Sequence, residues 1–143
     1  MSKKKRHVIS WDTCEDFDMI GICSHHPDYR LAWSINQLLQ LNLAKSNDNF
    51  HIYNKKGLLL SEHSYHFYCD ESTSTEWYLF KNKVNGKMLI PEKPQIDFFL
   101  ILRNNILFDV DEITTKLRDT NSVMAVFNFE PSSIPSTELI IFE

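Results

Sequence analysis

Ile96–Leu102 forms an apolar run that only Asp97 interrupts. A short, continuous run of this kind is typical of a strand buried on both faces, because a half-buried strand alternates apolar with polar side chains. The sequence therefore predicts a central strand in a sheet that other elements cover on both sides.

Two segments have the period of an α-helix. The first begins near Pro27, whose missing N–H suits a first helical turn. It places apolar residues on one face: Leu31, Ile35, Leu38 and Leu39. The second begins near Asp109, where Glu112 three residues later is typical of a capping box, and it continues to Leu117. The sequence thus predicts two helices.

Most of the remaining chain has the period of a strand. Asn85-Gly86 favours the tight turn of a hairpin, and Gly57 suits a second turn. The predicted strands are Phe50–Tyr53, Leu58–Leu60, Tyr65–Cys69, Trp77–Phe80, Met88–Ile90, Val123–Phe129 and Leu139–Phe142. We expect an α+β fold, with a mostly antiparallel sheet of about five to seven strands and two helices packed on one face. A single domain, 11–143, follows a basic flexible tail, 1–10.

Composition excludes several classes of function. Three glycines are too few for a glycine-rich phosphate loop. No apolar run approaches the roughly 20 residues that span a bilayer. Three widely spaced cysteines suit reduced thiols in a cytoplasm better than a disulfide framework. We therefore expect a cytoplasmic protein that does not enter a membrane.

The charge is distributed unevenly along the chain. Lys3, Lys4, Lys5 and Arg6 contribute four of the 15 basic residues, so the rest has 11 against 19 Asp and Glu, a net charge of −8. An acidic body repels the phosphates of nucleic acids. Only the tail could contact RNA or an acidic partner, and a solubilising tail is the simpler interpretation.

The segment Cys23-Ser-His-His-Pro-Asp28 gathers residue types that bind metals or act in catalysis. Zinc ligands commonly come in closely spaced pairs, which these residues do not form, although a cluster with His63 and Cys69 stays open. Cys23 beside a helix start could also act as a thiol with His25 or His63. A helix start explains the segment best, so no catalytic residue, metal or cofactor is predicted.

Ile90–Phe98 resembles the signature of the IPExxxVDY family of short bacterial proteins. Ile90, Pro91, Glu92 and Asp97 match, whereas Ile96 replaces Val and Phe98 replaces Tyr. The likeness extends to the helical segment 28–33 and to Asn82-Lys83. The resemblance implies an uncharacterised family and no activity, and the lost Tyr hydroxyl puts in doubt any role that needs it as a donor.

Asp97 is the unusual residue of this segment, because a buried carboxylate must find hydrogen-bond donors. Arg30, Arg103 or main-chain N–H groups could supply them. We expect Asp97 to form a structural ion pair or a hydrogen-bonded corner, and contact with a ligand or partner is the alternative. The predicted protein-binding surface is the Pro91–Asp97 connection with Tyr29 and Arg30, and its candidate residues are Tyr29, Arg30, Pro91, Glu92 and Asp97. The leading hypothesis is a non-catalytic interaction or adaptor domain with a protein partner.

Two alternatives stay open. The first is RNA binding through the basic tail and the aromatic strands, whose residues are Tyr65, Phe67, Tyr68, Trp77, Tyr78 and Phe80. The second is an enzyme acting on a small molecule, with Asp97, Arg30 and Cys23 in a concave pocket.

Overall fold

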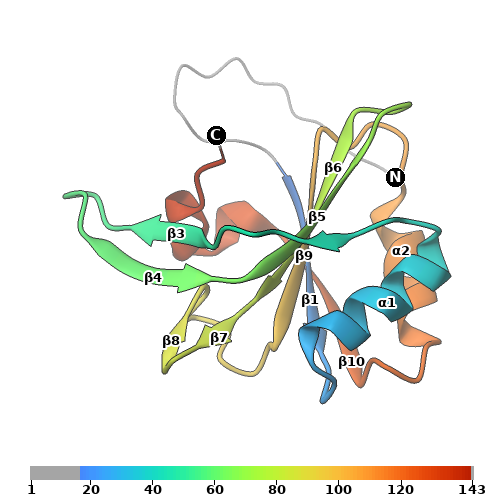
Figure 1. The fold of residues 1–143 in the computed structure, drawn as a ribbon, viewed down its shortest axis with the longest axis horizontal. Helices are drawn as coiled ribbons and strands as arrows, with labels where there is room; N and C mark the ends of the chain where they lie inside the picture. The colour runs from blue at the N-terminus through green and yellow to red at the C-terminus, as the bar shows by residue number, and fades with distance from the viewer. Residues whose placement is uncertain (1–16, 143) are drawn as a thin grey trace.

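The computed structural model describes residues 17–142, and the predicted apolar strand is β9 (Phe98–Arg103) within a six-stranded antiparallel sheet (Figure 1). The strand order is β10-β1-β9-β6-β5-β2. The other five strands are β1 (Phe17–Cys23), β2 (Ala44–Lys45), β5 (Tyr65–Asp70), β6 (Thr75–Lys81) and β10 (Ala125–Phe129). The predicted α+β class and antiparallel sheet are confirmed.

Two hydrophobic clusters lie on opposite faces of this sheet, because successive strand residues point to opposite sides. Leu100 and Leu102 belong to the first cluster, and Phe99 and Ile101 belong to the second. Both α1 (Asp28–Leu39) and α2 (Val110–Arg118) contribute buried residues to the first cluster. This shared cluster is consistent with the expected packing of the helices on one face.

The second face is covered by short elements and connections (Figure 1). These elements are β3 (Phe50–Tyr53), β4 (Leu59–His63), β7 (Lys83–Val84), β8 (Lys87–Met88), and the 3-10 helices η1 (Pro131–Ser133) and η2 (Pro135–Leu139). Ile52 from β3, Ile90 and Ile96 after β8, and Ile140 after η2 are buried there. The central strand is thus buried on both faces, as its continuous apolar run predicts.

Local signals in the sequence explain the ends of several elements. The Asp109 side chain accepts a hydrogen bond from the Asp111 N–H and caps α2 as predicted. Asn85 and Gly86 both have positive φ, 52° and 79°, in the turn between β7 and β8. Gly57 has φ 86° between β3 and β4. These turns occur where the sequence predicts them.

Three elements differ from the expectation. Strand β2, which forms one edge of the described sheet, was not predicted. Strand β1 was not predicted, although it lies between β10 and β9 and Met19, Ile20 and Ile22 are fully buried. The predicted final strand, Leu139–Phe142, is wrong, because Leu139 ends η2 and no strand follows it within the described residues. The N–H of Ile140 donates to the carbonyl of Thr137 (3.1 Å) at the end of this 3-10 helix, so it is not available to a sheet ladder. Among residues 17–142, no helix is long and apolar enough to cross a membrane.

Candidate interaction surfaces

The connection between β8 and β9, residues 89–97, is held by the side chain of Asn82. Asn82 is 0% exposed. Its amide donates to the carbonyls of Lys93 (3.2 Å) and Ile96 (2.8 Å), and its oxygen accepts from the Ile90 N–H (2.8 Å). One side chain therefore replaces the strand hydrogen bonds that this connection lacks.

Asp97 joins the end of this connection to the end of β1. Its carboxylate accepts a hydrogen bond from the Ser24 N–H (2.9 Å), and its own N–H donates to the carbonyl of Ile22 (3.0 Å). Of the partners suggested by the sequence, a main-chain N–H is therefore the one found here. Arg103 instead pairs with Glu76 at 2.7 Å. Asp97 serves as a hydrogen-bonded corner.

Pro91 and Glu92 are exposed within the same connection. The Glu92 carboxylate accepts a hydrogen bond from the Ser136 N–H in η2 (3.0 Å). Ile90 and Ile96 on either side of them belong to the second cluster. These two candidate residues therefore lie on the face covered by the short elements.

Tyr29 and Arg30 lie in the first turn of α1, which packs against the first cluster. Tyr29 is 69% exposed, and Trp33 one turn further along is 60% exposed. Residues four apart in a helix are neighbours on its surface, so the two aromatic side chains form one exposed stripe beside Arg30. We call Tyr29, Arg30 and Trp33 the α1 surface.

The structure does not bring the five predicted surface residues together, and they lie in three places. The α1 surface belongs to the helix that packs against the first cluster, whereas Pro91 and Glu92 adjoin residues of the second cluster. Asp97 lies in the corner between β1 and β9. Sequence reasoning did not select Trp33 as a site residue. Its spacing from Tyr29, together with its position opposite Leu31 and Ile35, is the signal that could have identified it.

Cys23 lies beside the Asp97 corner, and its Sγ donates to the carbonyl of Gln95 (3.3 Å). Burial raises the pKa of the Cys23 thiol, and the nearby Asp97 carboxylate raises it further, although Lys83 opposes this. The thiolate is the reactive form, so a raised pKa makes a poor nucleophile. His63 has other partners, because its ring nitrogens bond to the Lys81 carbonyl (2.9 Å) and the Ser61 hydroxyl (2.8 Å).

Iodoacetamide at neutral pH is expected to alkylate Cys23 more slowly than the exposed Cys69, because burial raises the pKa of the Cys23 thiol and limits the access of the reagent to it. Mass spectrometry of proteolytic peptides over a time course measures both rates. In denaturant the two cysteines should react at similar rates. Preferential labelling of Cys23 in the folded protein would revive the thiol hypothesis.

The aromatic residues of β5 and β6 contribute to the core. Trp77, Tyr78 and Phe80 are buried. Tyr65 and Phe67 are partly buried against the second cluster, and Tyr68 against the first. A sheet that stacks RNA bases exposes its aromatic faces, whereas these rings pack against one another and against aliphatic side chains. The basic tail, Lys3–Arg6, and the proposed boundary after residue 10 lie outside the described residues.

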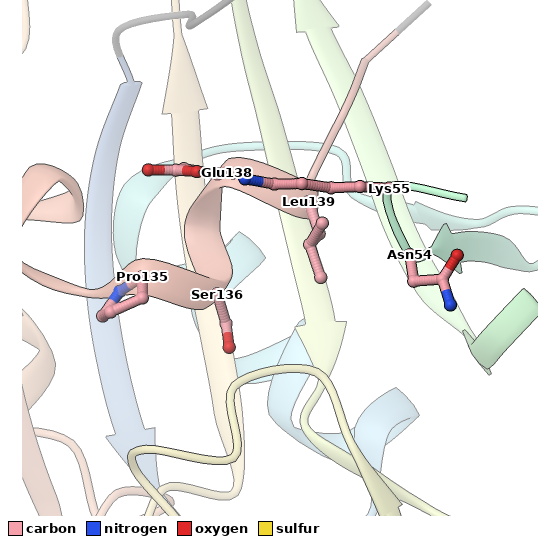
Figure 2. A pocket seen from close by; sticks show the side chains of 6 residues that line it. All are labelled: Asn54, Lys55, Pro135, Ser136, Glu138 and Leu139. Carbon is pink, nitrogen blue, oxygen red and sulfur yellow. Dashed lines mark ion pairs between the residues drawn. The ribbon is translucent and has the colours of Figure 1, made fainter. Parts of the chain in front are cut away.

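A hollow of about 330 Å³ lies between the β3–β4 turn and η2 (Figure 2). Lys55 reaches across it toward Glu138, with 3.7 Å between the ammonium and the carboxylate (Figure 2). The lining residues are Asn54, Lys55, Pro135, Ser136, Glu138 and Leu139. Neither Asp97, Arg30 nor Cys23 lines this hollow, so it does not supply the pocket of the enzyme hypothesis. Among residues 17–142, no group of three or more His, Cys, Asp or Glu side chains is placed so that it could hold a metal ion.

No family model matches the chain, and no curated protein matches it. The resemblance to the IPExxxVDY family therefore stays a prediction, and a functional interpretation depends on the geometry of the chain itself.

Proposed function

We propose that this chain is a non-catalytic cytoplasmic adaptor domain that binds a protein partner through the α1 surface. The observation that carries the proposal is the exposure of Tyr29 and Trp33, 69% and 60%, one turn apart on one helix. Trp, Tyr and Arg are the residue types that most often dominate binding energy at protein interfaces. Arg30 completes this set on the same exposed side of α1.

The setting of the α1 surface favours a preformed binding site. Leu31, Ala32 and Ile35 anchor the inner face of α1 in the first cluster, so the outer side chains project from a fixed backbone. A rigid helix loses little conformational entropy on binding. The Pro91–Asp97 connection is a second rigid surface on the other face, and its likeness to the IPExxxVDY signature supports membership of that family as part of the proposal.

Site-specific photocrosslinking tests the proposal in the protein's own host. A photoreactive phenylalanine analogue at position 33 is expected to capture one protein partner, whereas the same analogue at the exposed Tyr53 is not. With the isolated partner, Trp33→Ala should weaken binding by roughly 30-fold, the usual effect of losing a dominant aromatic residue.

Other crosslinking results would contradict protein binding through the α1 surface or favour RNA binding. Equal capture from positions 33 and 53 would refute the α1 surface. Crosslinks that disappear after nuclease treatment would favour RNA binding, which should also weaken steeply with salt and depend on Lys3–Arg6.

A further inference from the structure

Among residues 17–142, strand β10 forms one edge of the six-stranded sheet and pairs with β1 alone. Natural proteins often block such an edge, because its free N–H and C=O groups can pair with another strand. Met124 is 64% exposed and Phe127 is 42% exposed along this edge. The β10 edge therefore exposes apolar side chains, and no strand among residues 17–142 pairs with its outer side.

The hydrogen bonds around β1 identify which groups of β10 point outward. The Ile22 carbonyl accepts from Asp97 on the β9 side, and the Cys23 carbonyl accepts from Met124 on the β10 side. Main-chain groups alternate between the two sides of a strand, so the Ile22–Val126 pair is not hydrogen-bonded. The N–H and C=O groups of Val126 and Asn128 therefore face the free edge.

We propose that two copies of this chain associate through antiparallel pairing of their β10 strands, with Phe127 at the two-fold axis. This register places Val126 opposite Asn128 of the second copy, and Asn128 opposite Val126 of the second copy. Each of these pairs can exchange both main-chain hydrogen bonds, because the Val126 carbonyl, which already accepts from Arg118, has a second lone pair. The contact is isologous, as a closed two-fold dimer requires.

Side chains of α2 make the edge electrostatically self-complementary. Asn128 donates to the Asp111 carboxylate (3.3 Å), and Arg118 donates to the Val126 carbonyl (3.2 Å). Because the proposed register pairs Asn128 with Val126, Asp111 of each copy faces Arg118 of the other copy. The dimer therefore contains two such ion pairs. The first turn of α2 is acidic and its last turn is basic, so antiparallel helices from the two copies match in the same way.

The other side of the β10 edge is apolar. Phe127 stacks with Phe129, with 6.1 Å between ring centroids, and a Cβ at Gly21 would collide with the ring of Phe129. Pairing at the axis brings Phe127 against Phe127 of the second copy, and directly opposed aromatic residues stabilise antiparallel strands. The same register thus satisfies main-chain, ionic and apolar groups together.

Analytical ultracentrifugation over a wide concentration range tests the pairing. Wild-type protein should show a concentration-dependent dimer. Asn128→Pro should abolish it, because proline removes an outward N–H that the monomer's sheet does not use. Lys45→Pro, at the outward position of the opposite edge strand β2, is the matched control and should leave the dimer intact. Circular dichroism checks that both variants fold.

A charge exchange tests the register. Arg118→Glu and Asp111→Lys should each weaken self-association by roughly 100-fold, because like charges then face each other across the interface. Mixing the two variants should restore a heterodimer, in which both ion pairs are again opposite in sign. A wild-type monomer at every concentration would overturn the proposal. So would a dimer that survives Asn128→Pro or both charge variants.

Discussion

Replacing Asn82 with alanine is expected to lower the free energy of unfolding by about 3–5 kcal/mol, because each buried polar group left without a partner costs about 1–3 kcal/mol. The substitution leaves two such groups without a partner: the N–H of Ile90 and the carbonyl of Ile96. The Lys93 carbonyl loses one donor and keeps the Ile96 N–H at 3.1 Å. Chemical denaturation of the purified variant measures the loss. Hydrogen exchange at the Ile90 amide should accelerate as well.

Two further substitutions distinguish the effect of losing hydrogen bonds from the effect of losing side-chain volume. Asn82→Asp keeps the size of the side chain and the acceptor for the Ile90 N–H, but it places a second oxygen against two carbonyls. It should therefore also be strongly destabilising. The exposed Asn47→Ala should change stability by less than about 0.5 kcal/mol, as surface substitutions usually do. If Asn82→Ala were equally mild, the connection would be held by its apolar residues instead.

Elements that depend on local chemistry were predictable from the sequence. The Asp109 cap and the turns at Gly57 and Asn85-Gly86 depend on residues close in sequence, and the structure contains all of them. The continuous run of β9 was equally informative, because burial on both faces leaves a distinct pattern. The strands that were missed or wrongly predicted depend on residues far away in the sequence. Strand β1 is also buried on both faces, but Asp18 and Gly21 break its apolar run.

The candidate site was less predictable for a physical reason. Asp97 was selected as a residue that needs donors, yet its donor is the main-chain N–H of Ser24, 73 positions away. Every residue except proline has an N–H, so such a partner leaves no trace in the sequence. Asn82 bonds only to main-chain groups as well, so its importance is visible only in the structure. The α1 surface shows the opposite case, since helical spacing alone places Trp33 beside Tyr29.

The protein is expected to lose stability as the pH falls below about 6.5, because two buried histidines resist protonation in the folded state. Burial lowers the pKa of His63 and of His66 from the ordinary value of 6.5, and at His66 the nearby Lys45 adds to this effect while Asp28 opposes it. Both side chains are buried, and the Nδ1 of His66 has no hydrogen-bond partner among the described residues.

The direction of the effect follows from proton binding. Below pH 6.5 the unfolded chain protonates both imidazoles, whereas the folded chain does not until the pH reaches the lowered pKa values. Protons therefore bind more tightly to the unfolded state, and acidification favours unfolding. Each histidine contributes up to about 1.4 kcal/mol per pH unit within this window, or about 2.7 kcal/mol per pH unit together. Above pH 7 the contribution to stability is fully present.

Denaturant titrations between pH 7.5 and 5.5 measure this slope, in a range where most carboxylates stay ionised in both states. His66→Phe is the decisive control, because it removes one titrating group and a buried nitrogen that has no partner. It should reduce the slope by about half and raise the stability at pH 5.5 relative to the wild type. Stability that is flat or rises as the pH falls through this range would mean that the folded protein accepts these protons, and that the imidazoles are accessible to water.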